Sequence, residues 1–137
     1  MAVVVDTSFL YALTDRTEAD YAACVAALAA EPDAVIVPQS VLPEICYLIS
    51  SRLGPDTELA FLRGLSASDW RIAPMTAADM ARSMDLLETY RAADIGFVDA
   101  SVIAVAERLG VVRIYTLDRR DFGIMRPAHA EAFELLP

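Results

Sequence analysis

Short apolar, β-branched runs alternate with helical patterns along this chain, and the alternation limits the folds that it can adopt. Runs rich in valine or isoleucine occupy residues 3–5, 34–37 and 111–116, and a further strand is predicted at residues 70–74. Side chains of this kind pack well as buried strands. Because helical segments separate the runs, we expect an α/β fold with a mainly parallel central sheet and helices on both of its faces.

The helical segments are predicted from apolar residues at helical spacing and from capping residues. Thr7 or Ser8 can cap the first helix, Ser40 the third and Asp56 the fourth. Thr76 and Asp79 have the spacing of a capping box at the start of a long helix. The chain after Arg119 is expected to be a loop that ends in an edge strand at residues 133–136, so that the sheet has four to five strands. The expected helices cover residues 7–13, 18–30, 40–53, 56–66, 76–90 and 98–109.

Length and composition indicate one compact domain over residues 1–137. The chain has 137 residues, and 56% of them are hydrophobic, which is enough to bury a single core. It contains no apolar run of the ~20 residues that a membrane span needs, and Asp6 interrupts any apolar signal segment. We therefore expect a cytoplasmic protein without a membrane partner. Cys24 and Cys46 are far apart, which favours reduced thiols over a disulfide or a zinc motif.

Four acidic residues are predicted to lie at one edge of the sheet. Asp6 directly follows the first strand, and Asp118 follows the fourth. Glu44 lies in the first turns of the helix after the second strand, and Asp99 lies in the first turn of the helix before the fourth. Ligands of open α/β sheets bind outside the carboxyl ends of the strands. Each acid also has a structural interpretation, because first-turn acids favour the helix dipole and Asp118 can begin a turn.

Carboxylates gathered at such an edge would repel each other unless a cation were bound. Hard carboxylate oxygens suit Mg²⁺ or Mn²⁺, and two such ions would balance a formal charge of about −4. This arrangement is typical of phosphoryl chemistry. The one histidine, His129, lies in the predicted C-terminal loop, and no glycine-rich phosphate loop is present. These observations disfavour histidine-based acid–base catalysis and a nucleotide triphosphatase.

The four acids predicted at this edge lie in four segments: Val4-Val5-Asp6-Thr7-Ser8, Pro43-Glu44-Ile45, Gly96-Phe97-Val98-Asp99-Ala100-Ser101 and Thr116-Leu117-Asp118. In order and spacing these segments resemble those of PIN-domain ribonucleases, and with their near-complete coverage of the chain they are most similar to VapC-type toxins of toxin–antitoxin pairs. The resemblance implies a three-layer α/β/α fold and Mg²⁺- or Mn²⁺-dependent cleavage of RNA by metal-activated water.

The resemblance also implies roles for single residues. Asp6, Glu44 and Asp99 would be the core metal-binding acids, with Asp118 as the fourth. The hydroxyl groups of Thr7 and Thr116 would order this cluster. Two further acids have less definite places: Asp94 lies just outside the core motif as a candidate for metal or substrate binding, and Asp121 is interpreted as a solvated loop acid.

The implied partners are RNA, a second copy of the chain in a homodimer, and a cognate VapB-like antitoxin that covers the site. The antitoxin surface is expected on the first helices, where the candidates are Phe9, Tyr11, Tyr21, Tyr47 and Leu48, with ordinary core packing as the alternative for most apolar residues there. The net charge of −9 is a difficulty for RNA binding, since phosphates normally need a basic surface. Four arginines near Asp118 are candidates for phosphate contacts, with ordinary solvated arginines as the alternative: Arg113, Arg119, Arg120 and Arg126.

Three functions therefore remain open from the sequence. The first is an endoribonuclease toxin that an antitoxin inhibits. The second is a PIN-type nuclease that acts in RNA processing or on structured DNA outside a toxin–antitoxin system. The third is a catalytically silent module that only binds a protein partner, which would bind no divalent cation.

Overall fold

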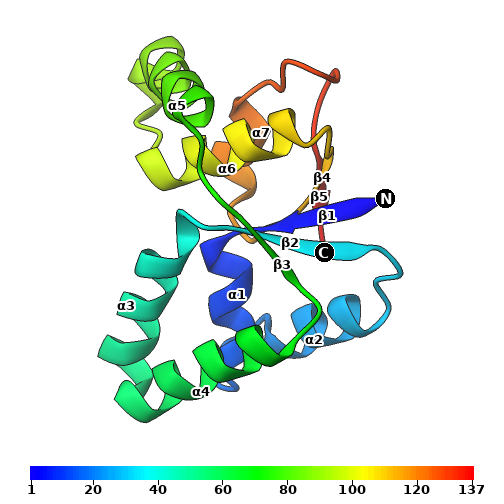
Figure 1. Ribbon diagram of the computed structural model, residues 1–137, viewed down its shortest axis with the longest axis vertical. Helices are drawn as coiled ribbons and strands as arrows, with labels where there is room; N and C mark the ends of the chain where they lie inside the picture. Colours follow the sequence, from blue (N-terminus) through cyan, green and yellow to red (C-terminus); the bar gives the residue numbers. More distant parts are fainter.

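A five-stranded sheet runs through the middle of the molecule in the computed structural model, which describes residues 1–137 (Figure 1). The strand order is β3-β2-β1-β4-β5, and every neighbouring pair is parallel. The predicted parallel sheet is thus confirmed, including the strand expected near the C-terminus. The strands are β1 (Ala2–Val5), β2 (Ala34–Pro38), β3 (Arg71–Ala73), β4 (Arg113–Tyr115) and β5 (Glu134–Leu136).

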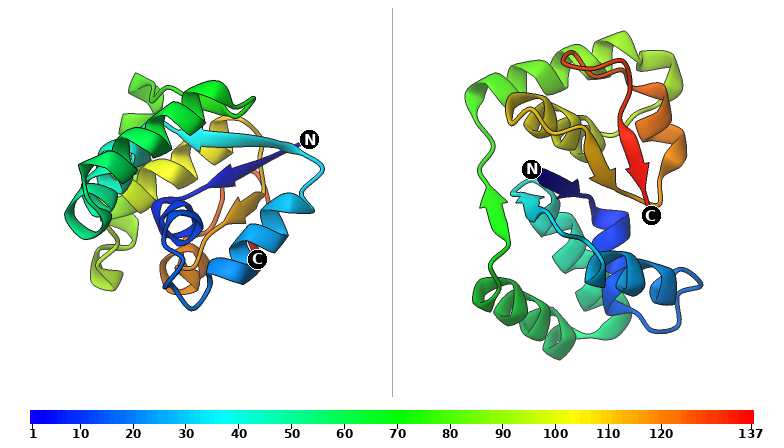
Figure 2. Two further views of the ribbon diagram at one scale, coloured as in Figure 1. Left: turned by 90° about the horizontal axis from the view of Figure 1, so that it is seen from below. Right: turned by 90° about the vertical axis from the view of Figure 1, so that its right-hand side faces the viewer.

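Helices cover both faces of the sheet, so that the molecule has the predicted three layers (Figures 1 and 2). One helical layer contains α1 (Thr7–Thr14), α2 (Tyr21–Ala29), α3 (Val41–Leu53) and α4 (Pro55–Ala67). The other contains α5 (Ala77–Thr89), α6 (Phe97–Arg108) and α7 (Arg119–Ile124). A short 3-10 helix, η1 (Arg91–Ala93), connects α5 to α6.

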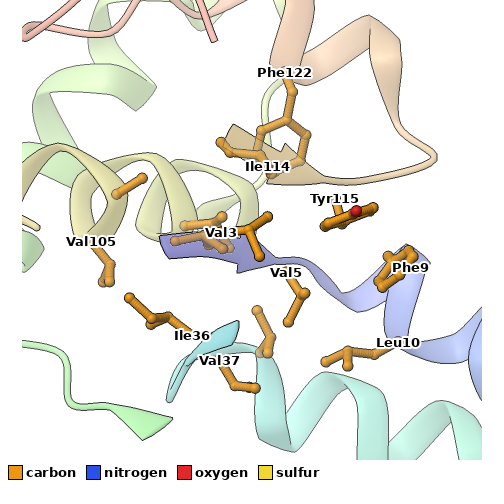
Figure 3. Close-up of a cluster of buried hydrophobic side chains, with 14 of the residues drawn as sticks. Val3, Val5, Phe9, Leu10, Ile36, Val37, Val105, Ile114, Tyr115 and Phe122 are labelled. Carbon is orange, nitrogen blue, oxygen red and sulfur yellow. The ribbon is translucent and has the colours of Figure 1, made fainter. Parts of the chain in front are cut away.

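The central strand β1 is buried on both of its faces. Val3, Val4 and Val5 are fully inaccessible to solvent, as expected for a strand that helices cover on both sides. Figure 3 shows Val3 and Val5 among side chains of the neighbouring strands and of α1 and α6. The run of valines therefore fixes the end of β1, and with it the position of Asp6, in the middle of the sheet.

The predicted helix caps are partly wrong. Asp6, and neither Thr7 nor Ser8, is the N-cap of α1, and its carboxylate accepts a hydrogen bond from the backbone N–H of Phe9 at 2.9 Å. Ser40 precedes α3 without a side-chain cap bond. Gly54, at a φ of 95°, precedes α4, so Asp56 lies inside its first turn.

The capping box of α5 is confirmed. Thr76 Oγ1 accepts from the backbone N–H of Asp79 at 3.1 Å, and Asp79 Oδ2 accepts from the backbone N–H of Thr76 at 2.9 Å. Gly110, at a φ of 69°, follows the end of α6 and stops it as predicted.

The segment after Arg119 is not simply a loop, because it begins with the six-residue helix α7. Asp118 is the N-cap of this helix, and its Oδ1 accepts from the backbone N–H of Asp121 at 3.0 Å. A helix this short shows no apolar periodicity in the sequence, which is why it was not expected. No helix in the structure combines the length and the apolar character needed to cross a membrane.

Candidate metal centre

Asp6 is held in a fixed orientation at the carboxyl end of β1. Its side chain is almost fully buried, and the residue is 3% exposed. Besides the N–H of Phe9, Asp6 accepts hydrogen bonds from the hydroxyl of Ser8 at 2.8 Å and from that of Thr116 at 2.5 Å. Three donors therefore hold the carboxylate of Asp6, and Thr116 has the supporting position that was predicted for it.

Ser8, rather than Thr7, supplies the other supporting hydroxyl. Ser8 Oγ donates to Asp6 and accepts from the backbone N–H of Leu117 at 2.9 Å, so it joins the end of β1 to the segment before Asp118. Thr7 Oγ1 is buried and has no hydrogen-bond partner. The prediction that the Thr7 hydroxyl orders the acids is therefore wrong, since the first turn of α1 directs Ser8 toward them instead.

Asp99, Asp118 and Asp121 form a group of acids beside Asp6. One carboxylate oxygen of each lies within 4.8 Å of the other two. Asp99 lies in the first turn of α6, while Asp118 and Asp121 are the N-cap and a first-turn residue of α7. The interpretation of Asp121 as a solvated loop acid is wrong, because α7 turns its side chain back toward Asp99. The spacing of Asp118 and Asp121, an N-cap followed three residues later by an acid, was the available signal.

Glu44 completes the set of four predicted acids. It is an exposed residue in the first turn of α3 and lines the same cavity as Asp6, Asp99 and Asp118. The cavity has a volume of about 350 Å³. A link that sequence reasoning missed joins its two sides: the hydroxyl of Ser101 in α6 donates to that of Ser40, directly before α3, at 2.6 Å. The other lining residues are Thr7, Ser8, Leu48, Gly96, Phe97 and Val98.

Asp6 and Asp99 bind protons more tightly than carboxyl groups usually do. Burial raises the pKa of Asp6 from 3.8 to about 6, although the bonds from Phe9, Thr116 and Ser8 oppose the rise. The pKa of Asp99 lies well above its usual range, because the group is buried and faces the negative charges of Asp6, Asp118 and Asp121. Arg120 pairs with Asp121, but no cationic side chain forms an ion pair with Asp6, Asp99 or Asp118.

This donor set fits a divalent cation. Its atoms are carboxylate oxygens, which Mg²⁺ and Mn²⁺ prefer, and the raised pKa of Asp99 shows the charge conflict that a cation would remove. No arginine or histidine lines the cavity. The acids Asp99, Asp118 and Asp121 are placed to share one ion, with Asp6 and Glu44 beside them.

The prediction that Arg113 contacts phosphate is wrong. Arg113 begins β4, and thus lies at the amino edge of the sheet rather than at the carboxyl edge. Its guanidinium is bound by Glu31 Oε1 at 2.8 Å and by Asp33 Oδ2 at 3.0 Å. Sequence proximity to Asp118 was misleading because the length of β4 separates the two residues.

The other three arginines lie on or after α7. Arg119 donates to the carbonyl oxygen of Pro137, and Arg120 pairs with Asp121 at 2.6 Å while donating to the carbonyl oxygen of Ala93 at 2.9 Å. Arg126 is exposed and forms no ion pair. Asp94 is exposed on the turn before α6, at a φ of 56°, and does not line the cavity.

The residues expected on a partner surface differ in their exposure. Phe9 and Tyr11 are buried in the core and offer no surface, so this part of the prediction is wrong. Tyr47 is 72% exposed, whereas Tyr21 and Leu48 are half-buried.

Comparisons with known proteins agree with this fold. Residues 3–125 match the model of the PIN domain family, so the chain belongs to that family. Its sequence is 36% identical, over 135 residues, to ribonuclease VapC26 of Mycobacterium tuberculosis, and the match covers 98% of this chain and 100% of the relative. The predicted resemblance to VapC-type PIN domains is thereby confirmed.

Solved structures extend the similarity. The crystal structure of VapC20 from Mycobacterium tuberculosis, a toxin that cleaves the sarcin–ricin loop, superposes with a TM-score of 0.81 at 25% identity, covering 86% of this chain and 91% of that one. VapBC2 from Rickettsia felis, bound to a DNA fragment from its promoter, gives a TM-score of 0.73 at 16% identity with full coverage of both chains. The second similarity shows the shared fold.

Proposed function

We propose that this chain is an endoribonuclease toxin that depends on Mg²⁺ or Mn²⁺ and is inhibited by a VapB-like antitoxin. The observation that carries the proposal is the cavity at the carboxyl edge of the sheet, where four acids from four different elements meet without a basic side chain. The similarity to ribonuclease VapC26 over nearly the whole chain supports RNA as the substrate.

Each acid has a role in this proposal. Asp99, Asp118 and Asp121 would hold the cation, and Asp6 and Glu44 would complete its surroundings. The cation would supply Lewis acidity, which makes water a better nucleophile at neutral pH and neutralises charge on the phosphoryl group. Ser8 and Thr116 keep the carboxylate of Asp6 turned toward the cavity. The products would be a 5′-phosphate and a 3′-hydroxyl.

The proposed partners are a cognate antitoxin and a second copy of the chain. Solved relatives with this fold include VapBC toxin–antitoxin complexes, which supports an antitoxin. Co-expression with the small gene next to the toxin gene tests the proposal. We expect the chain alone to stop growth and the neighbouring product to restore it, whereas toxicity that the neighbour leaves unchanged would contradict the antitoxin assignment.

Cleavage of total cellular RNA in Mg²⁺ tests the activity itself. We expect discrete cuts that disappear in chelator and return when Mg²⁺ or Mn²⁺ is restored. Asp6→Asn should abolish the cuts, since Asn retains the cap of α1 but lacks the negative charge. Equal cleavage with and without chelator would refute the proposed mechanism.

A further inference from the structure

Phe97 is an exposed aromatic side chain at the rim of the acidic cavity. It is the first residue of α6, is 40% exposed, and lies two residues before Asp99 in the same helical turn. The cavity lining contains only two other apolar side chains, Leu48 and Val98, and both pack against the hydrophobic core. Phe97 neither belongs to that core nor stacks on another ring or an arginine.

Because the cavity is acidic, it needs a contact to RNA that does not depend on positive charge, and an exposed aromatic ring can supply one. Its lining contains Asp6, Glu44, Asp99 and Asp118 but no lysine, arginine or histidine, and the whole chain carries a net charge of −9. The residues that line the cavity therefore offer a phosphate no cationic contact, and Arg120 beside them is already paired with Asp121. Stacking of a base on an aromatic side chain needs no positive charge and stabilises single-stranded nucleic acid strongly, base by base.

We propose that the ring of Phe97 stacks on an unpaired RNA base next to the scissile phosphate and so positions that phosphate over the acids. This inference rests on the proposed ribonuclease function and adds a specificity-determining residue to it. The substrate class that follows is RNA whose cleavage site is unpaired, since a base in a duplex cannot leave its neighbours without an energetic cost.

An abasic scan tests this contact directly. A randomised single-stranded oligoribonucleotide pool is incubated with the full chain in Mg²⁺, and one sequence that is cut at a single bond is selected. Each nucleotide within two positions of that bond is then replaced, one at a time, by an abasic nucleotide. For the wild type, we expect one adjacent abasic position to lower kcat/KM about tenfold, mainly through KM.

Phe97→Ala should lower kcat/KM for the intact oligonucleotide by a similar factor. The abasic replacement should then have no further effect on this variant, because the protein change and the RNA change remove the same contact. Phe97→Trp should retain activity. Leu59→Ala, which truncates an apolar side chain 47% exposed on α4, is the matched control and should behave as the wild type.

A second readout is independent of cleavage. With 2-aminopurine at the sensitive position of a cleavage-resistant phosphorothioate oligonucleotide, the wild type should quench the fluorescence and Phe97→Ala should not, while both bind Mn²⁺ equally in calorimetry. Two results would overturn the inference: Phe97→Ala cuts the intact oligonucleotide at the wild-type rate, or it stays as sensitive as the wild type to the abasic position. The ring would then serve a protein partner or the fold. A wild type that cuts no RNA in Mg²⁺ overturns the proposed function as well.

Discussion

Two clusters of acids lie at opposite edges of the same sheet, and they differ in what neutralises them. At the amino edge, Glu31 is bound by Arg113 at 2.8 Å and by the hydroxyl of Tyr115 at 2.6 Å, and these contacts lower the pKa of Glu31 to about 2. At the carboxyl edge, Asp6 and Asp99 face other acids, and the pKa of each is raised.

The difference separates a structural site from a functional one. Both edges bury carboxyl groups, but Arg113 at the amino edge binds the buried Glu31, whereas Arg120 at the carboxyl edge pairs only with Asp121. There the ion pairs of Arg113 with Glu31 and Asp33 hold the segment after α2 against β4, and no bound cation is needed to balance the acids. The four acids that line the cavity at the carboxyl edge form no ion pair, so they are left available for a cation from solution. Acidity alone does not distinguish the two edges, whereas the pKa of Glu31 is lowered and the pKa values of Asp6 and Asp99 are raised.

The largest effect should come from Asp99, which lies among the acids of the carboxyl edge. Asp99→Asn keeps the size of the side chain but removes a charge that the cation needs. Since such an ion supplies several kcal/mol of transition-state stabilisation, we expect RNA cleavage to fall about a thousandfold. The initial rate of cleavage in saturating Mg²⁺ measures this. A variant within tenfold of the wild type would remove Asp99 from the site.

Arg113→Ala should instead destabilise the fold. The change leaves Glu31, whose side chain is 1% exposed, as an unpaired charge, and breaking such a pair costs about 3 kcal/mol. Urea unfolding measures the loss. Cleavage per folded molecule should be unchanged, and a loss of cleavage without a loss of stability would place Arg113 in the functional site after all. The matched control is Arg126→Ala, an exposed arginine without an ion pair.

Ser8 and Thr7 provide an internal comparison within the carboxyl edge. Ser8→Ala removes a hydrogen bond to Asp6, and groups that orient a metal ligand in this way are worth about tenfold or more in activity or metal affinity. Thr7→Val should have almost no effect, because the Thr7 hydroxyl has no partner to lose. Mn²⁺ affinity by calorimetry, together with cleavage rate, checks both variants. The reverse ranking would mean that Thr7 orders the acids.

The smallest effect concerns pH in chelator. The pKa of Asp6 is raised from 3.8 to about 6, so the folded protein binds more protons than the unfolded one in that window, and its stability falls as pH rises from about 4 to 6. The pKa of Glu31 is lowered from 4.5 to about 2. The contribution of Glu31 to stability is therefore present above about pH 4.5 and is lost as the pH falls from there to about 2. Thermal unfolding from pH 4 to 7 should show the decline, to which Asp99 also contributes because its pKa is raised too; Asp6→Asn should make the decline shallower, and added Mg²⁺ should flatten it. An unchanged slope in Asp6→Asn would show that Asp6 does not titrate there.

The sequence was sufficient for the sheet and for most of the acids, and the reasons are local. Val3 to Val5 could only form a buried strand, so the acid that ended it had to lie at the edge of the sheet. Glu44 and Asp118 followed from the rule that places strand ends together, whereas Asp99 lies in a helix that precedes its strand, so its placement depended on the turn at Gly96. The capping box at Thr76 was readable because its two bonds lie within four residues.

The errors share a different cause, which is that side-chain direction depends on packing. Asp121 was missed because α7 is too short to show periodicity. Arg113 was misplaced because sequence distance does not tell one end of a strand from the other. Whether Thr7 or Ser8 faces Asp6 depends on the geometry of one helical turn, and the order of the strands depends on the whole chain.

The most direct test of the central claim is the anomalous scattering of crystals grown or soaked in Mn²⁺. We expect a peak between the carboxylates of Asp99, Asp118 and Asp121 at the carboxyl edge of the sheet, and none beside Glu31 and Asp33 at the amino edge. A saturated crystal without a peak at the carboxyl edge, or with its main peak at the amino edge, would contradict the assignment of the two acid clusters.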